Sequence, residues 1–315
     1  MSFAPQVSDE VAEALRAGRP VVALETTLVS HGFSAGRGLQ AALDSEARVR
    51  AEGGVPATVG VLDGAIRVGL TSDELARFAA AGTSARKAGA RDLAACVVQG
   101  ALGSTTVGGT LAVCRAAGIR FVGTGGIGGV HRGFAQTLDI SADLPQLART
   151  RAMVVCSGAK SILDVSATSE LLETLGVPVL GWRTGTLPMF YSALGGPPVS
   201  ATVTDAEEAA RIAAAHWQLG AGRDGADSAS GLILARPPAD GLDIEALITR
   251  AVEQVRADGI TGQAVTPAVL TAVEQLSDGR SVEVNRRLIA DNAALAARVA
   301  VAHAALPVGD AGPRS

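Results

Sequence analysis

Short apolar segments alternate with segments of helical spacing along this chain, and this alternation restricts the fold more than any other feature. The apolar segments lie at residues 20–24, 58–62, 119–123, 154–156 and 231–235. Helical patterns run over residues 38–51, 71–80, 110–117, 161–175 and 206–219. Strands that are buried on both faces show as continuous apolar runs, and parallel strands need crossover connections. The pattern predicts an α/β fold, a three-layer α/β/α sandwich with a mixed, largely parallel central sheet.

A turn at Asp63-Gly64 is the reason to expect a mixed sheet. It joins the apolar residues 58–62 to residues 66–68, and this dipeptide between two strands is typical of a hairpin. The 315 residues contain no midpoint linker rich in proline or serine and no internal repeat, so we expect a single domain over residues 1–315. Residues 221–230 are small, polar and without period, and we expect a mobile loop there.

Composition and charge argue against several classes of function. The formal net charge is −4 and no basic stretch carries interleaved aromatic residues, so we expect no nucleic-acid partner. No apolar run reaches the ~20 residues that span a bilayer, and the N-terminus lacks the pattern of a signal peptide, so we expect no membrane partner. The three cysteines lie in apolar surroundings without metal-type spacing, which is typical of core thiols in a reducing cytoplasm.

Lysine is nearly absent from the chain. Only Lys87 and Lys160 stand beside 25 arginines (27 basic residues less the two lysines). Arginine replaces lysine as a charge but not as a nucleophilic amine, because its guanidinium stays protonated. Lys87 taken alone reads as a solvated surface charge. Lys160 ends the apolar run 153–160, where burial would favour the neutral amine that Schiff-base chemistry needs.

A carboxylate directly follows the first apolar strand. Glu25 comes after residues 21–24, at the carboxyl end of the strand, where open α/β sheets bind their ligands. Partial burial would raise its pKa and suit it to proton transfer. The alternative is a carboxylate that caps a turn or pairs with an arginine, and this residue alone does not decide between the two.

Glycine dominates residues 123–133, which follow a predicted strand. The Gly-x-Gly-x-x-Gly spacing matches a dinucleotide site, but no clear helix follows and no carboxylate stands about 20 residues later. We interpret the run as a backbone nest for a smaller anion, such as one phosphate, with charge and donors from His131 and Arg132. The alternative is a tight turn that needs positive φ angles.

Two acidic residues flank a serine in residues 139–143. In an extended segment, Asp139, Ser141 and Asp143 point the same way, and in a helix the two carboxylates share a face. Either geometry suits a hard cation such as Mg²⁺ or Mn²⁺, held by few protein ligands and several waters. The commoner alternative is helix N-capping by Ser141 or Asp143.

Two further features leave alternatives open. The hydroxyl-rich turn 103–110 precedes a helix, so its backbone amides can bind a phosphate, or Thr106 or Thr110 can cap the helix. Asn285 and Asn292 stand seven residues apart, on one face of the predicted closing helix. They can reach a ligand or merely solvent.

Seven stretches of the chain resemble the pseudouridine-5′-phosphate glycosidase family, also called the indigoidine synthase A-like family. They are ALETTLVSHG, GGVPATVGVLDG, TGGIGGVHRG, DISADL, VVCSGAKSILD, LETLGVPVLG and NRRLIADNA. The resemblance runs from about residue 8 to about residue 302. It implies reversible cleavage of the C–C glycosidic bond of pseudouridine 5′-phosphate to uracil and ribose 5-phosphate, in pseudouridine catabolism. It also implies one Mn²⁺ per subunit and a homotrimer.

The resemblance assigns roles to particular residues. Glu25 matches the proton donor, Lys160 the lysine that forms a Schiff base with ribose C1′, and Lys87 a second, substrate-binding lysine. Asp139 matches the metal ligand. The other substrate-binding positions that it implies are Val107, His131, Ser141, Ala142, Asp143 and Asn285, with Asn292 as the alternative to Asn285.

A carbon leaving group explains these residue types. Uracil leaves through its C5 atom, which must be protonated as the bond breaks, and Glu25 can supply that proton. Joining C1′ of the opened ribose to Lys160 lets the nitrogen lone pair form an iminium as the bond breaks, which makes the cleavage a retro-Mannich type step. Two alternatives stay open. A class I aldolase-like sugar-phosphate lyase would not need uracil, and a non-catalytic nucleotide-binding protein would tolerate Lys160→Arg.

Overall fold

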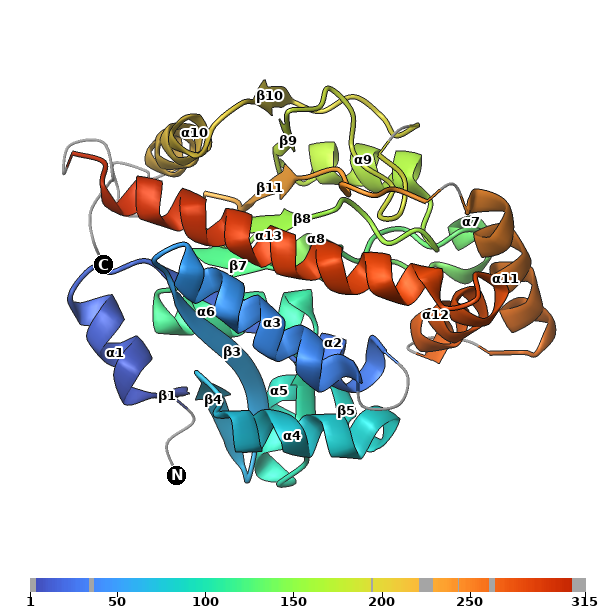
Figure 1. The fold of residues 1–315 in the computed structure, drawn as a ribbon, viewed down its shortest axis with the longest axis horizontal. Helices are drawn as coiled ribbons and strands as arrows, with labels where there is room; N and C mark the ends of the chain where they lie inside the picture. Colours follow the sequence, from blue (N-terminus) through green and yellow to red (C-terminus); the bar gives the residue numbers. More distant parts are fainter. Residues whose placement is uncertain are drawn as a thin grey trace.

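The computed structural model of the protein describes residues 4–33, 37–193, 195–220, 229–242, 244–260 and 264–307. Its strands are β1 (Gln6–Val7), β2 (Val21–Glu25), β3 (Val55–Leu62), β4 (Ala65–Val68), β5 (Arg86–Ala88), β6 (Gly103–Thr105), β7 (Phe121–Gly123), β8 (Met153–Cys156), β9 (Val179–Trp182), β10 (Ala201–Val203) and β11 (Leu232–Ala235). Figure 1 shows their arrangement.

Helices of very different length surround these strands (Figure 1). The α-helices are α1 (Asp9–Arg16), α2 (Thr27–His31), α3 (Arg37–Ala51), α4 (Ser72–Ala81), α5 (Leu93–Val98), α6 (Val107–Ala117), α7 (Phe134–Thr137), α8 (Asp143–Leu147), α9 (Val165–Thr174), α10 (Ala206–Leu219), α11 (Glu245–Ala257), α12 (Val265–Leu276) and α13 (Arg280–Ala304). Two short 3₁₀ helices are η1 (Gly82–Ser84) and η2 (Ala90–Asp92). In the described part of the chain, no helix combines the length and hydropathy that a membrane span requires.

One sheet joins the described strands. Its order is β1-β4-β3-β2-β7-β8-β11-β9-β10, and the pair β5-β6 is attached to β3 through β6. The pairs β3-β4 and β3-β6 are antiparallel, whereas the other pairs, including the central run β2-β7-β8-β11, are parallel. The predicted mixed, largely parallel sheet is therefore confirmed.

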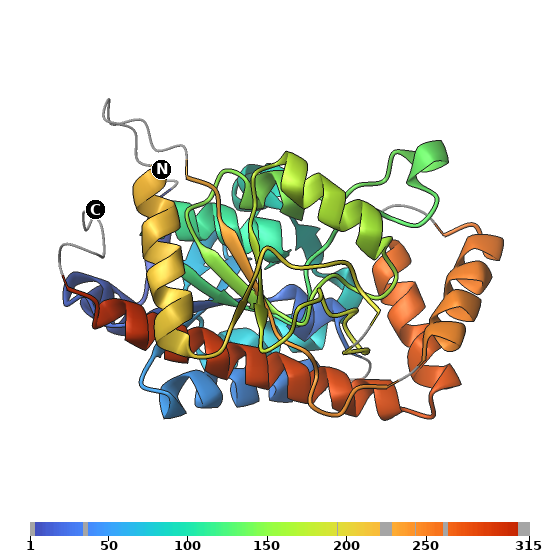
Figure 2. The ribbon, with the colours of Figure 1, turned by 90° about the horizontal axis from the view of Figure 1, so that it is seen from above.

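The two faces of strand β2 belong to two separate hydrophobic cores. Val21 and Ala23 lie in a core with buried residues of α1, α6, α8 and α9. Val22 and Leu24 point the other way, into a core with α10, α13 and Val49 of α3. Figure 2 shows α13 and α3 together on one side of the sheet and α9 on the other. Alternate side chains of a strand point to opposite faces, so both faces are covered and the three-layer prediction is confirmed.

Two local sequence signals have the structure that they predict. The Asp63-Gly64 turn has both residues at positive φ, 51° and 71°, and joins the antiparallel strands β3 and β4. Helix α4 begins with a capping box, in which the Thr71 side chain accepts from the Glu74 amide and the Glu74 carboxylate accepts from the Thr71 amide.

Other helix boundaries differ from the sequence pattern, and capping side chains explain the difference. Helix α9 was predicted from residue 161, but the Asp164 side chain accepts from the Ala167 amide and the helix begins at Val165. Residues 157–164 consequently form a loop after β8, and this loop carries Lys160. Apart from its last two residues, the mobile loop expected at 221–230 lies outside the described residues.

Candidate active site

Three neighbouring strands end at the same edge of the sheet and bring two predicted catalytic residues together. Glu25 is the last residue of β2, and Lys160 lies in the loop after β8, with β7 between the two strands. The loop after β7 pairs with the loop of Lys160, because the Lys160 amide donates to the Ile127 carbonyl at 3.0 Å. In open α/β sheets, ligands bind at the carboxyl ends of strands.

Both lysines of the chain line one narrow pocket. This lysine pocket has a volume of about 40 Å³, and its walls include Thr27, Lys87, Gly125, Gly126, Lys160 and Asn285. It adjoins an outer cavity of about 430 Å³, with which it shares five lining residues, among them Pro267 and Leu270 of α12. Ligand sites are concave and typically ~300–1,000 Å³, so the two cavities together have the size of a nucleotide site.

Glu25 is almost completely buried, with 2% of its surface exposed. Thr27 Oγ1 donates a hydrogen bond to Glu25 Oε2, and Thr124 Oγ1 donates one to Oε1. Burial raises the pKa of the Glu25 carboxyl, and the neighbouring Lys160 charge and the two hydroxyls oppose that effect. A carboxyl whose pKa is raised is suited to give up a proton near neutral pH.

Lys87 is not the solvated surface charge that it would be in isolation. It lies in the middle of strand β5, opposite Ser104 of β6, and is half-buried. Burial lowers the pKa of the Lys87 amine, and the nearby Lys160 lowers it further, whereas Asp143, Glu25 and Asp139 act in the opposite direction. The same acidic and basic residues that the sequence singles out therefore share one electrostatic environment.

Asp143 ties two loops of the site together. Its Oδ1 accepts from the Gly108 amide at 2.7 Å, and its Oδ2 accepts from the Gly128 amide at 2.9 Å. Gly108 belongs to the first turn of α6, next to the buried Val107, so this carboxylate also faces the positive end of a helix. The predicted binding residue Ala142 is exposed and precedes α8 without a side-chain cap, and Ser141 Oγ accepts from the Asp143 amide.

The glycine-rich run 123–133 packs closely against neighbouring segments. Two of its amides bond to protein acceptors, Ile127 to the Gly158 carbonyl and Gly128 to Asp143, so these two are not available to an anion. Gly133 at its end has the positive φ, 82°, that a tight turn needs, whereas the glycines at positions 123–129 do not. They are needed for close packing, because a Cβ on Gly128 would lie 2.2 Å from Ser141 Oγ and one on Gly126 would lie 2.6 Å from the Phe190 ring.

Arg132 also differs from expectation. Its guanidinium donates to the Ser161 carbonyl at 2.9 Å and the Leu163 carbonyl at 3.3 Å, and it pairs with Glu245 of α11 at 2.6 Å. The two carbonyl acceptors belong to the loop that carries Lys160. The side chain therefore fastens that loop to α11, instead of offering its charge to an anion as the sequence suggested.

His131 and Asp139 lie next to each other. The His131 amide donates to the Asp139 carbonyl at 3.0 Å, and His131 Nδ1 is 3.8 Å from Asp139 Oδ2. Both line a cavity of about 630 Å³ beside α11. Burial lowers the pKa of His131, and Asp139 opposes the shift. Across the described residues, no group of three or more His, Cys, Asp or Glu side chains is arranged to hold a metal ion.

The two late asparagines have different surroundings. Asn285 is 4% exposed and lines the lysine pocket, and its Oδ1 has no hydrogen-bond donor among the described residues. Asn292 lies seven residues further along α13. It donates to the Thr124 carbonyl at 2.8 Å and to Ser157 Oγ at 3.1 Å. Asn285 is therefore the asparagine at the pocket, and Asn292 links α13 to the ends of β7 and β8.

Three residues of the site were not singled out from the sequence. Thr27 and Thr124 bind Glu25, and His31 lines the lysine pocket with its Nδ1 2.6 Å from Ser30 Oγ. Thr27 had a usable signal, because a hydroxyl two residues after a strand-end carboxylate can reach back to it. Thr124 is 99 residues from Glu25, and such a pairing has no local signature.

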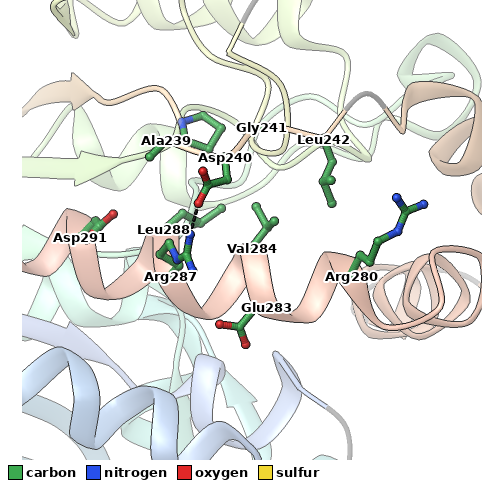
Figure 3. Close-up of a pocket in the computed structure, with 11 residues that line it drawn as sticks. Ala239, Asp240, Gly241, Leu242, Arg280, Glu283, Val284, Arg287, Leu288 and Asp291 are labelled. Carbon is green, nitrogen blue, oxygen red and sulfur yellow. Dashed lines mark hydrogen bonds and ion pairs between the residues drawn. The ribbon is translucent and has the colours of Figure 1, made fainter.

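A further cavity, of about 330 Å³, lies between the outer side of α13 and the loop at residues 238–242 (Figure 3). Figure 3 shows Val284 and Leu288 along its floor, and Asp240 paired with Arg287 across its rim. None of the site residues expected from the sequence lines this cavity. Helix α13 therefore presents Asn285 to the lysine pocket and neighbouring residues to a separate surface hollow.

Comparison with known proteins identifies close relatives by sequence. The family model described as indigoidine synthase A like protein matches residues 10–302. The pseudouridine-5′-phosphate glycosidase of Herpetosiphon aurantiacus is 46% identical over 301 residues, which cover 94% of this chain and 97% of that protein. The pseudouridine-5′-phosphate glycosidase of Streptomyces griseus subsp. griseus is 46% identical over 303 residues, covering 96% and 93%.

Two solved structures are similar over nearly the whole chain. The prealnumycin C-glycosynthase AlnA, solved in complex with ribulose 5-phosphate, is 40% identical with a TM-score of 0.85, covering 97% of this chain and 98% of that one. An indigoidine synthase A-like protein from Thermotoga maritima is 32% identical with a TM-score of 0.84, covering 95% and 96%. By sequence and by structure, the chain belongs to the indigoidine synthase A-like family.

Proposed function

We propose that the protein is a pseudouridine-5′-phosphate glycosidase, which reversibly cleaves the C–C glycosidic bond of pseudouridine 5′-phosphate to uracil and ribose 5-phosphate. The observation that carries this proposal is the lysine pocket, where the chain's two lysines meet beside the buried Glu25. The names of the curated relatives support the reaction. The ribulose 5-phosphate bound to AlnA supports a sugar phosphate as the substrate class.

We propose Lys160 as the amine that forms a Schiff base with C1′ of the opened ribose. As the glycosidic bond breaks, its electron pair stays with the protonated uracil, and the lone pair of the lysine nitrogen forms the iminium at C1′, a route that a carbon leaving group needs. Lys87 is the competing candidate, because burial lowers its pKa and so favours its neutral form. The family resemblance assigns covalent chemistry to Lys160 and substrate binding to Lys87.

Borohydride trapping with ribose 5-phosphate distinguishes the two lysines. We expect a reduced adduct on Lys160, located by peptide mass spectrometry, in the natural protein and in Lys87→Arg. We expect no adduct and no turnover in Lys160→Arg, because the guanidinium stays protonated. An adduct that persists in Lys160→Arg and disappears in Lys87→Arg would reverse the assignment.

Glu25 is the proposed source of the proton for uracil C5. Its raised pKa keeps the carboxyl protonated to a higher pH than an exposed glutamate, and the Thr27 and Thr124 hydroxyls fix its orientation. In the reverse direction the carboxylate takes the C5 proton back. Cleavage should therefore decline as the pH rises through the pKa of Glu25 in the complex.

The remaining predicted residues are proposed to bind substrate. Asn285 Oδ1 lacks a donor among the described residues, and a uracil N–H would supply one. His131 and Lys87 are proposed to contact the phosphate, since the two basic side chains lie close to each other and to Asp139. Backbone groups at Val107 and at residues 141–143 are proposed to complete the walls.

We propose that Asp139 holds one Mn²⁺ per subunit. The donor set fits a hydrated ion, because Mn²⁺ accepts carboxylate and water oxygens. The Asp139 side chain is 37% exposed and borders a cavity of about 630 Å³, which leaves room for waters. A bound ion would supply charge that orients the phosphate. Asp139→Asn should weaken Mn²⁺ binding in calorimetry at least tenfold.

The most direct test follows uracil release from pseudouridine 5′-phosphate, with Mn²⁺ and with a chelator. We expect release with Mn²⁺, much slower release with chelator, and consumption of ribose 5-phosphate only when uracil is present. Consumption of ribose 5-phosphate without uracil would favour an aldolase-like lyase instead. No uracil release under any of these conditions would refute the proposal.

Assembly and cellular role are also proposals. We propose a homotrimer in the cytoplasm that degrades pseudouridine 5′-phosphate, as the family resemblance implies. Light scattering after size exclusion should give a mass near three times the 31.6 kDa of one chain. A mass near 31.6 kDa at micromolar concentration would argue against the trimer.

A further inference from the structure

Glu25 does not itself line the lysine pocket in the described structure. It is 2% exposed, and it is not among the described residues that line the pocket. Thr27, which begins α2 two residues after the end of β2, does line it. The Thr27 hydroxyl is hydrogen-bonded to Glu25 Oε2. The hydroxyl that is hydrogen-bonded to the buried Glu25 carboxyl therefore belongs to a residue that lines the lysine pocket.

The second hydroxyl on Glu25 has no such position. Thr124 Oγ1 donates to the other carboxylate oxygen, Oε1. Thr124 is completely buried and is not among the described residues that line the pocket. The chain thus offers two threonines that make the same kind of hydrogen bond to the same carboxyl. Only Thr27 connects that carboxyl with the pocket.

We propose that Thr27 is a catalytic residue that relays the proton between Glu25 and C5 of the uracil ring. This inference rests on the proposed glycosidase function. In cleavage, the Oε2–H bond of Glu25 breaks and its proton bonds to Thr27 Oγ1, while the Thr27 Oγ1–H bond breaks and that proton bonds to C5. The electron pair of the C5–C1′ bond stays with the uracil ring and restores its C5–C6 double bond, and the lone pair of the Lys160 nitrogen on C1′ forms the iminium. Two protons move, the net transfer is one proton from Glu25 to C5, and Thr27 ends unchanged.

A hydroxyl suits this role because it accepts and donates a hydrogen bond at the same time. With Glu25 ionised, the Thr27 hydroxyl hydrogen points to Oε2, as its donated bond requires. With Glu25 protonated, the carboxyl donates to Oγ1, and the hydroxyl hydrogen turns to the pocket. The alternative is that Glu25 reaches C5 directly and Thr27 only orients it, as Thr124 does.

The rate of uracil release, measured across pH, distinguishes a proton relay from an orienting role for Thr27. The variants to compare are Thr27→Val, Thr27→Ser and the matched control Thr124→Val. Each valine removes one hydroxyl that lowers the pKa of Glu25, so either change should move the alkaline limb of the profile to higher pH. The relay adds a loss of about 10²–10⁴-fold for Thr27→Val on the acidic plateau, where Glu25 is already protonated. Thr27→Ser keeps the hydroxyl and should lose less than about tenfold, as should Thr124→Val.

Borohydride trapping of ribose 5-phosphate on Lys160 is the second readout. Ribose 5-phosphate forms the Schiff base without any proton transfer at C5, so Thr27→Val should trap as much adduct as the natural protein. Should Thr27→Val fail to fold, Thr27→Ala removes the same hydroxyl with a smaller side chain, and the same results are expected.

If Thr27→Val keeps the plateau rate of uracil release and only its alkaline limb shifts, the relay is overturned. Thr27 is then a residue that orients Glu25. Equal plateau losses in Thr27→Val and Thr124→Val overturn it as well, because only Thr27 reaches the pocket. Natural protein that traps no adduct and releases no uracil refutes the glycosidase proposal itself, and the relay falls with it.

Discussion

At the scale of single residues, the site contains polar groups that cost stability. Glu25 is buried with its pKa raised, and Asn285 has a buried oxygen without a donor among the described residues. A buried acceptor left unsatisfied costs about 1–3 kcal/mol. Groups of this kind are expected where binding or catalysis needs them, and each gives a stability prediction that is independent of any assay of turnover.

Glu25→Gln should stabilise the folded protein in a pH-dependent way. Because the folded pKa of Glu25 is raised, its contribution to stability is full at low pH and is lost as the pH rises through the folded pKa. Glutamine does not ionise, so the Tm of the variant should exceed that of the natural protein at high pH, and the gap should close toward about pH 5. Scanning calorimetry over pH measures this, with exposed Glu13→Gln as the control.

A gap in Tm that stays constant with pH would show that ionisation of Glu25 is not its source. The same variant should release no uracil from pseudouridine 5′-phosphate, because the amide cannot donate a proton to carbon.

The two asparagines of α13 should respond in opposite ways to leucine. Asn285→Leu removes an oxygen without a donor, so the free energy of unfolding should stay the same or rise by about 1 kcal/mol, while KM rises. Asn292→Leu leaves the Thr124 carbonyl and Ser157 hydroxyl without their donor, and should cost about 2–3 kcal/mol. Urea unfolding tests both, and equal losses in the two variants would contradict this reading.

At the scale of elements, local signals were predictable and short or paired elements were not. The capping box at Thr71 and the hairpin at Asp63 rest on contacts within four residues, which the sequence displays. Strands β5 and β6 have three residues each, too few to show a period of two. Lys87 therefore looked like a surface residue, although β5 places it in the pocket.

Asp143 joins two elements, the start of α6 and the loop after β7, so its removal should destabilise both. Hydrogen bonds to a charged group are worth about 1.5–3 kcal/mol each, and Asp143 accepts two from backbone amides. We expect Asp143→Ala to lower the free energy of unfolding by about 3 kcal/mol or more. The control is Asp139→Ala, half-exposed and measured with chelator, which should change it by less than about 1 kcal/mol. Similar losses for the two would contradict the linking role.

At the scale of the whole molecule, the layers were predictable and the assembly of the site was only partly so. Apolar runs indicated which strands are buried, and strand ends indicated Glu25 and Lys160. The partners of Arg132 and of the glycine run could not be inferred, because Glu245 is 113 residues from Arg132 and the bonds of the glycine run depend on which loops the fold brings together. The roles proposed for the site residues stay predictions until the assays above are done.

The hollow outside α13 should be separable from the site. Arg287 pairs with Asp240 at its rim, and both side chains are more than half exposed. Exposed ion pairs contribute about 0–1 kcal/mol, so Arg287→Ala should change the free energy of unfolding by less than about 1 kcal/mol. Uracil release should stay within about twofold of the natural rate, because α13 turns Asn285 to the opposite cavity. A large loss of turnover would connect this hollow to the site.

Two parts of the lining of the lysine pocket differ in how far mutation can change its shape. Gly125 and Gly126 form one wall, and a Cβ there would lie 3.0 Å from Ile289 and 2.6 Å from Phe190. Leu28 of α2 and Leu270 of α12 line the same pocket and are only half-buried. Selection for a different base would therefore leave the glycine wall unchanged and act on the leucines, so a library randomised at Leu28 and Leu270 is the starting point for altering the base that the proposed glycosidase accepts.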